Sequence, residues 1–247
     1  MKTALLVIGL VLLALILPFF LPSPASDGKG DPDSNLPWQI QLDDQGNSRV
    51  FGLTPGRSTL AQVRQRLGND MDIAIVAGPG EVGDLEAYYT QVPLGFVLAR
   101  LILTADLSPD AITAMRERAL KAERMESSTR KITLHPDDLA AVENTPIRAF
   151  SLIPNVNLDE ATIIQRFGQP VERIAVGANL THFLYPHLGL DVVLDRKGKE
   201  LLQYVAPRDF EARIRAPLRA AQAKAVADAA AKEAEETARK PAKEPAN

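Results

Sequence analysis

The spacing of apolar residues predicts two short helices, each ended by a glycine and followed by strands. Apolar positions in 60–67 fall three and four residues apart, which is the spacing of one helix face, and Gly68 ends that helix. Residues 158–167 repeat the pattern, and Gly168 and Pro170 end it. The apolar face of this second helix is predicted to consist of Leu158, Ala161, Ile164 and Phe167.

Alternation of apolar and polar residues predicts many strands separated by Gly, Pro, Asp and Asn. A stronger helix is predicted from Ser108 to about Glu126, and a short one after His135. The fold class is therefore α+β, with one or two modules in which a helix lies on an antiparallel sheet. The predicted strands are 38–42, 48–53, 71–77, 85–92, 96–104, 130–134, 146–152, 172–176, 181–185, 190–195 and 200–205.

The segment Thr3–Leu21 carries no charge. Its residues, at 1.5 Å rise each, span about 28 Å as a helix, which is close to the thickness of a bilayer core. Lys2 precedes it and an aspartate-rich stretch follows, so we expect a cytoplasmic N-terminus and a periplasmic body. The alternative is a cleaved signal peptide, because Ser23 and Ala25 are small residues with cleavage-site spacing; the body would then be secreted to the periplasm.

Composition divides the chain into five parts. A linker rich in Ser, Pro, Gly and Asp follows the apolar segment, and the C-terminal tail is rich in Ala, Lys and Glu. The tail is predicted to be helical or disordered, with Phe210, Ile214 and Leu218 able to dock its first half. The predicted parts are 1–22 (transmembrane anchor or signal), 23–37 (linker), 38–145 (first module with extra helices), 146–207 (second module) and 208–247 (tail).

Composition also excludes several classes of site. The chain has no cysteine, which rules out thiolate–zinc sites, thiol nucleophiles, disulfides and acylation on cysteine. With 28 basic and 31 acidic residues and a net charge of -3, it lacks the basic character of a nucleic-acid-binding protein. Only three histidines are present, so a histidine-rich metal site is not expected, and no cofactor is predicted.

The two short predicted helices suggest an internal repeat, and the alternative is that their short match arose by chance. The stretch 61–68 (AQVRQRLG) aligns with 161–168 (ATIIQRFG). Downstream, Tyr89 and Tyr185 each precede a Leu-Gly pair and a buried strand. Each unit would then be one helix on a small antiparallel sheet. Identical pairs in the alignment are Ala61/Ala161, Gln65/Gln165, Arg66/Arg166 and Gly68/Gly168.

At these residues the chain resembles the small outer-membrane-assembly lipoproteins of the BamE/SmpA/OmlA type. The family pattern of a helix LTxxQVxxxLGxP, a strand ending in Tyr and a strand like VxFDxxG is met by Leu158–Pro170, Tyr185 and Asp191–Lys199. The resemblance is best over 152–205 and extends weakly to 53–104. It implies a helix-on-sheet fold and a binding module. This chain differs in lacking the acylated cysteine and having an apolar segment in its place.

No constellation of catalytic residues stands out. Arg66 and Arg166 recur just before each helix-ending glycine, where they can pair with a partner's carboxylate or compensate the helix dipole. With Tyr185 they are the candidate partner-binding residues. We therefore predict a non-catalytic, inner-membrane-anchored envelope protein whose periplasmic body binds another protein, with no nucleic-acid partner. The alternative is a ligand-binding or hydrolytic domain, which a pocket gathering Tyr88, Tyr89, His182 and Asp191 would favour.

Overall fold

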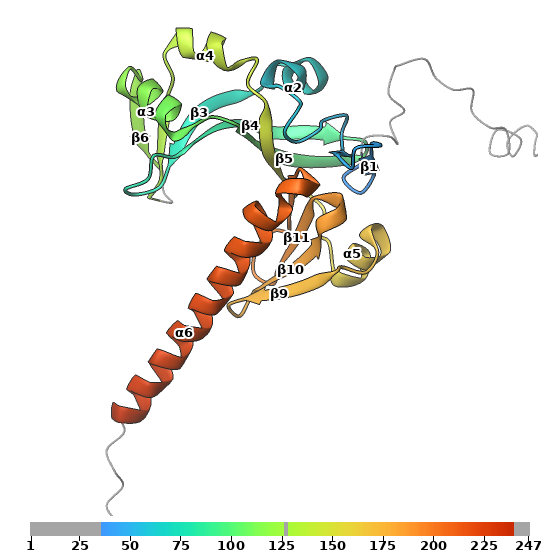
Figure 1. Ribbon diagram of the computed structural model, residues 1–247, viewed down its shortest axis with the longest axis vertical. Coiled ribbons are helices and arrows are strands. Elements are labelled where there is room, and N and C mark those ends of the chain that lie inside the picture. The colour runs from blue at the N-terminus through green and yellow to red at the C-terminus, as the bar shows by residue number, and fades with distance from the viewer. Residues whose placement is uncertain (1–35, 126–127, 240–247) are drawn as a thin grey trace, which may run out of the picture. The chain divides into compact units, whose positions relative to one another are not determined.

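The computed structural model describes residues 36–125 and 128–239. They form an α+β fold with a ten-stranded antiparallel sheet, a two-stranded hairpin, short helices and a long C-terminal helix (Figure 1), so the predicted fold class is confirmed at this level. The predicted membrane segment 1–22 and most of the linker lie outside the described residues. No helix within the described ranges combines the length and the apolar character needed to cross a bilayer.

The ten strands form one continuous antiparallel sheet, in which the two predicted modules are halves. The halves meet where β5 pairs with β8, with Leu101 opposite Leu152 and Leu103 opposite Phe150. In spatial order the strands are β6 (Lys121–Arg124), β7 (Arg130–Thr133), β3 (Asp72–Ala77), β4 (Asp84–Leu94), β5 (Val97–Ala105), β8 (Ile147–Pro154), β12 (Leu201–Val205), β11 (Leu190–Asp195), β10 (Leu180–Tyr185) and β9 (Glu172–Val176).

Four short helices bury their apolar residues in one core cluster on one face of this sheet. Val63, Ile112, Val142 and Ile163, one from each helix, are at most 2% exposed and belong to the same cluster. Burial of such side chains stabilises the fold by about 1.5–3 kcal/mol each. The helices are α2 (Leu60–Leu67), α3 (Pro109–Glu117), α4 (Pro136–Val142) and α5 (Glu160–Phe167).

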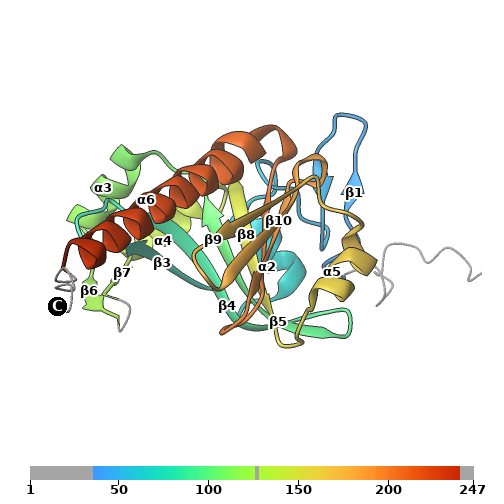
Figure 2. The ribbon, with the colours of Figure 1, turned by 90° about the horizontal axis from the view of Figure 1, so that it is seen from below.

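The C-terminal segment packs on the opposite face of the second half. A π-helical turn at Glu211–Arg215 continues into α6 (Ala216–Arg239), so the predicted helical tail is confirmed to residue 239. Phe210 and Ile214 pack against apolar residues of β9, β10 and β12, and Leu218 adds to this second cluster. Figure 2 shows α6 in front of the strands and α2 behind them.

The first described residues belong to the core rather than to the linker. Leu36 is only 6% exposed, and the carbonyl of Pro37 accepts a hydrogen bond from Tyr204 of β12 at 2.9 Å. The predicted hairpin that follows is confirmed, but its ladder is short: β1 (Gln41–Leu42) pairs with β2 (Ser48–Arg49). Phe51 then packs in the core against the rings of Phe150 and Tyr204. Residues 36–53 thus tie the N-terminal side of the body to β8 and β12, in the second half of the sheet.

The prediction of a helix continuing to Glu126 is wrong beyond residue 117. Residues Lys121–Arg124 form the edge strand β6, which pairs with β7, and Leu120 donates its backbone N–H to the Thr133 carbonyl. The stretch is rich in helix formers, but intrinsic propensity amounts to only a few tenths of a kcal/mol per residue. Pairing with a neighbouring strand outweighs it.

Small differences also appear at α5. Its N-cap is Asp159, whose carboxylate accepts from the Thr162 N–H at 2.7 Å, so the helix begins at Glu160, two residues after the predicted start at Leu158. Ile163 is the buried residue of this helix, and Ala161, predicted on the buried face, is exposed. Shifting the buried position by one residue rotates the apolar stripe by about 100°, the angle between successive residues of an α-helix.

Candidate partner-binding surface

The internal repeat has a shared physical basis in the structure. The hydroxyl of Tyr89 donates to the Gly68 carbonyl at 2.8 Å, and that of Tyr185 donates to the Gly168 carbonyl at 2.9 Å. Each bond ties the second strand of a unit to the end of its helix, where a glycine with positive φ turns the chain. Equivalent residues therefore make equivalent contacts in both halves.

Tyr185 lies inside the core. Its side chain is fully buried, and burial raises the pKa of the phenol above its ordinary value. Its hydroxyl is already engaged with Gly168. A partner's atoms cannot reach a buried phenol in this conformation, so the structure gives Tyr185 a packing role, and we do not retain it in the contact surface.

The two repeated arginines are exposed and make different contacts. Arg66 donates from Nε to the Phe51 carbonyl, in the N-terminal segment. The guanidinium of Arg166 lies over the ring of Trp38, 4.5 Å from its centroid. A cation over an indole face is attracted by about 0.5–1 kcal/mol at an exposed site. Both arginines also lie in the last turn of a helix, where a positive charge favours the dipole.

Arg166 lies beside a pair of aromatic side chains at the surface. Trp38 packs against Phe96, with ring centroids 5.9 Å apart and planes tilted by 54°. Phe96 is 70% exposed because it sits at the turn between β4 and β5, directly after Gly95, whose φ is +60°. The Asn155 N–H donates to the Leu98 carbonyl at 2.8 Å, which brings the loop after β8 alongside. We call Trp38, Phe96 and Arg166 the Trp38 surface.

The composition of this surface is typical of a binding site. Phe96 exposes a large apolar ring, and the half-buried Trp38 contacts both this ring and the guanidinium of Arg166. Trp and Arg are enriched among residues that carry most of the energy of protein–protein contacts. Exposed apolar groups that lie together, with a charge at the rim, mark such sites more reliably than scattered ones.

Sequence reasoning found Arg166 but missed its neighbours. Trp38 was assigned to a hairpin strand and Phe96 to the start of a buried strand. The available signal was the Leu-Gly-Phe sequence at 94–96, since a glycine turn exposes the residue that follows it. The proximity of Trp38, Phe96 and Arg166 depends on three distant segments.

The four residues of the alternative site are not gathered. His182 and Asp191 face each other across β10 and β11 at 2.8 Å, both buried on the sheet face that carries the second cluster. Tyr89 lies on the other face, and Tyr88 is on β4, five strand positions from β10. At about 4.8 Å per strand, those two strands are about 24 Å apart.

The buried His182–Asp191 pair is closed off from solvent. Asp191 is 0% exposed, and burial raises the pKa of its carboxyl although His182 lies within hydrogen-bond distance. One oxygen of Asp191 has no hydrogen-bond partner among the described residues. Within the same residues no group of three or more His, Cys, Asp or Glu side chains is placed to hold a metal ion.

The edge strand of the second half is partly covered. Gln222 of α6 donates from its side-chain amide to the Ala175 carbonyl of β9 at 3.2 Å, and Arg219 pairs with Glu172 at 3.2 Å. Covering an edge strand with a helix blocks the addition of another strand. Partner binding by strand addition is therefore disfavoured at β9.

Comparison with protein-family models, with curated proteins and with solved structures finds no match for this chain.

Proposed function

We propose that this protein is a non-catalytic, membrane-anchored envelope protein whose periplasmic body binds another protein through the Trp38 surface. The observation that carries the proposal is the contact of the half-buried Trp38 with the exposed side chains of Phe96 and Arg166. The N-terminal apolar segment supports the anchor, and the composition of the body argues against a nucleic-acid partner. The helix-on-sheet repeat supports a BamE-like binding module as its origin.

Hydrogen bonds to the body of the protein hold the Trp38 surface in a fixed position. Tyr204 holds the Pro37 carbonyl next to Trp38, and the β4–β5 hairpin carries Phe96 on a paired strand end. A pre-ordered aromatic side chain loses little conformational entropy when a partner covers it. Such a surface suits a partner with an apolar pocket and an acidic rim that faces Arg166.

The proposal is tested by site-specific photocrosslinking in intact cells. A photoreactive residue at Phe96 is expected to capture one protein, and Trp38→Ala is expected to abolish the capture. The matched control places the same probe at Leu120, which is similarly exposed (62%) but lies at the β6 end of the sheet. Capture of the same proteins from both positions, or insensitivity to Trp38→Ala, would contradict the Trp38 surface as the contact site.

The single tryptophan offers a second readout. Because Trp38 lies in the proposed contact, binding of the captured partner to the purified full chain should shift its emission to shorter wavelength and protect it from acrylamide quenching. Arg166→Ala should weaken that binding by about fivefold, since it removes the charge proposed to face the partner's acidic rim, and an exposed charge pair contributes up to about 1 kcal/mol. Unchanged emission on saturating binding places the contact elsewhere.

The predicted orientation is tested separately with a reporter fused to the C-terminus. An enzyme that is active only in the periplasm should be active there, because the body is expected beyond the membrane. Activity of a cytoplasmic reporter at the same position would overturn the localisation and leave the geometry of the Trp38 surface intact.

A further inference from the structure

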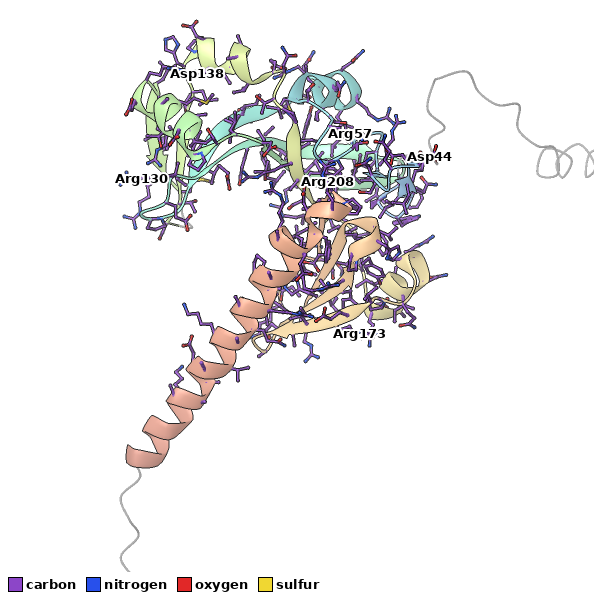
Figure 3. All side chains as sticks on the ribbon, in the orientation of Figure 1. Asp44, Arg57, Arg130, Asp138, Arg173 and Arg208 are labelled. Atoms are coloured by element: carbon purple, nitrogen blue, oxygen red, sulfur yellow. The ribbon has the colours of Figure 1, made fainter. Side chains whose placement is uncertain are left out.

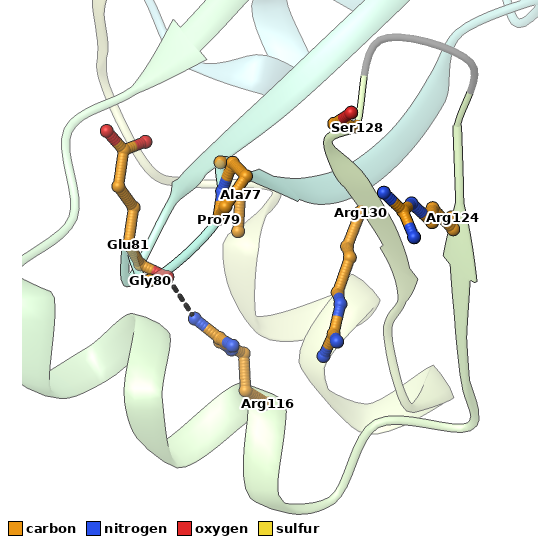
Figure 4. Close-up of a pocket in the computed structure, with 9 residues that line it drawn as sticks. Ala77, Pro79, Gly80, Glu81, Arg116, Arg124, Ser128 and Arg130 are labelled. Carbon is orange, nitrogen blue, oxygen red and sulfur yellow. Dashed lines mark hydrogen bonds between the residues drawn. The ribbon is translucent and has the colours of Figure 1, made fainter.

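Three arginines converge at the β6 end of the sheet, next to the glycine-rich connection between β3 and β4. They line a pocket of about 500 Å³ together with the loop Gly78–Glu81 and Ser128 (Figure 4). Arg130 lies far along the sheet from Arg173 on the opposite edge strand (Figure 3). We call Arg116, Arg124, Arg130 and this loop the arginine pocket. It is separate from the Trp38 surface and does not depend on it.

Two of the arginines are held directly opposite each other. Arg124 ends β6 and Arg130 begins β7, and the two are cross-strand partners, with Ala77 of β3 next in the same row. Directly opposed residues of an antiparallel pair have Cβ atoms about 4.5–5.5 Å apart, and like charges there repel. Among the residues that the structure describes, neither guanidinium has a carboxylate partner: the nearby acids Glu123 and Asp72 pair with lysines instead.

The third arginine comes from the helix that covers this end of the sheet. Arg116, in the last turn of α3, donates from Nη1 to the carbonyls of Glu81 and Val82, at 2.9 and 2.5 Å. These bonds fix the loop and orient the guanidinium, whose Nε–H and Nη2–H donors have no partner within the described ranges. In Figure 4 the Glu81 carboxylate points away from all three guanidinium groups.

We propose that the arginine pocket binds a phosphomonoester group. Three guanidinium groups without a described counter-charge favour a dianion over a singly charged carboxylate, and their planar forks match phosphate oxygens. An anion there would also relieve the repulsion between Arg124 and Arg130. The volume lies in the range of small-molecule sites, about 300–1,000 Å³, so the pocket is large enough for a phosphate with an organic group attached.

No motif in the sequence predicts this site. The glycine-rich stretch 78–83 lacks the Lys-Ser/Thr that follows a phosphate-binding loop, and it reads as a long hairpin connection. The positive charges come instead from α3, β6 and β7. Only the pairing of the mispredicted strand β6 with β7 brings Arg124 opposite Arg130.

The test is calorimetric titration of the full chain, in a maltoside detergent, with inorganic phosphate at pH 8 and constant ionic strength. Wild type should bind phosphate saturably, and Arg124→Gln and Arg130→Gln should each weaken binding about tenfold, as expected for a charge-assisted hydrogen bond. The matched control is Arg100→Gln, which removes an exposed arginine of β5 outside the pocket and should leave binding unchanged. Equal weakening by Arg100→Gln would overturn the proposal.

Thermal unfolding separates binding from folding. Phosphate should raise the Tm of wild type more than chloride at equal ionic strength, because a ligand of the native state stabilises it. In phosphate-free buffer Arg124→Gln should melt no lower than wild type, because it removes a repulsion, and its Tm should no longer respond to phosphate. A lower Tm of this variant without phosphate would show a structural role and contradict the anion site.

The source of the phosphate is settled by three further ligands in the same detergent. Tighter, Arg130-dependent binding of micelle-borne phosphatidic acid than of glycerol 3-phosphate identifies a lipid headgroup. Equal or tighter binding of glycerol 3-phosphate identifies a soluble phosphate ester. Succinate binding as tightly as phosphate, or no saturable binding by any of them, refutes the assignment.

Discussion

The twin tyrosine–glycine hydrogen bonds lead to a quantitative prediction about the repeat. Tyr185→Phe removes only the hydroxyl that donates to the Gly168 carbonyl at 2.9 Å, and Tyr89→Phe does the same at Gly68, at 2.8 Å. A net protein hydrogen bond stabilises the folded state by about 0.5–1.5 kcal/mol. Both glycines are exposed, so water can reach the freed carbonyl. We therefore expect about 1 kcal/mol from each variant rather than a full desolvation penalty.

The two effects should be equal and additive. The tyrosines lie on β4 and β10, strands about 24 Å apart, and effects at such separations add to within about 0.5 kcal/mol. The double variant should thus lose about 2 kcal/mol, which for a body of this size lowers the Tm by roughly 4–8 °C. The control is Tyr88→Phe: the Tyr88 side chain is half-buried, and its hydroxyl makes no hydrogen bond in the described residues.

The assay is urea unfolding of the full chain in detergent, followed by far-ultraviolet circular dichroism. A lower midpoint with an unchanged m-value reports a change in stability alone. Tyr88→Phe should stay within about 0.5 kcal/mol of wild type. The reasoning would be refuted if Tyr89→Phe or Tyr185→Phe were no less stable than Tyr88→Phe.

Three further predictions concern single contacts, and each is measured by denaturant unfolding. Arg118→Leu should lower the free energy of unfolding by about 2 kcal/mol at pH 7, because it removes the hydrogen bonds to the buried Asp138 carboxylate. Arg118 lowers the pKa of Asp138, so its stabilising effect is present above the ordinary pKa of the carboxyl and is lost as the pH falls through the lowered pKa. The difference in stability between wild type and variant should therefore shrink, and not grow, over that fall in pH. Burial raises the pKa of Asp191, so wild type loses stability as the pH rises through this raised pKa. The stability of Asp191→Asn relative to wild type should therefore increase between pH 4 and pH 8. A decrease would contradict burial as the cause of the raised pKa. Gly189→Ala places a Cβ 2.1 Å from the Val205 carbonyl oxygen at φ +64°, and should cost about 3 kcal/mol or more, whereas Gly177→Ala, at φ +65° in open space, should cost only about 1 kcal/mol; equal costs would exclude the clash.

The sequence predicted local structure correctly where the interactions that produce it lie within a few residues of one another. Gly68 ends α2 as expected, and Thr59 caps its start, because a cap satisfies backbone groups of its own first or last turn. His135 begins α4 in the same way, with its ring nitrogen accepting from the Asp137 N–H. Residues 121–124 were misread because helix propensity is a local quantity, and strand pairing with 130–133 is not.

The candidate sites also divide into features that local sequence predicts and features that depend on distant segments. The repeat identified Arg166, but nothing near it in sequence indicates Trp38 or Phe96, which approach it from two other segments. The repeat also suggested Tyr185, which is buried because alternate residues of β10 face the core. Conversely, Arg124 and Arg130 gain significance only as cross-strand partners.

The sequence by itself determined most of the elements, the α+β class and the helix-ending glycines, because these follow from residue spacing and backbone geometry. The tertiary structure alone decided that two repeats share one sheet and which exposed side chains meet. The physical reason is that pairing between distant strands is selected by burial of the whole core, and surface clusters form wherever that pairing happens to place their members.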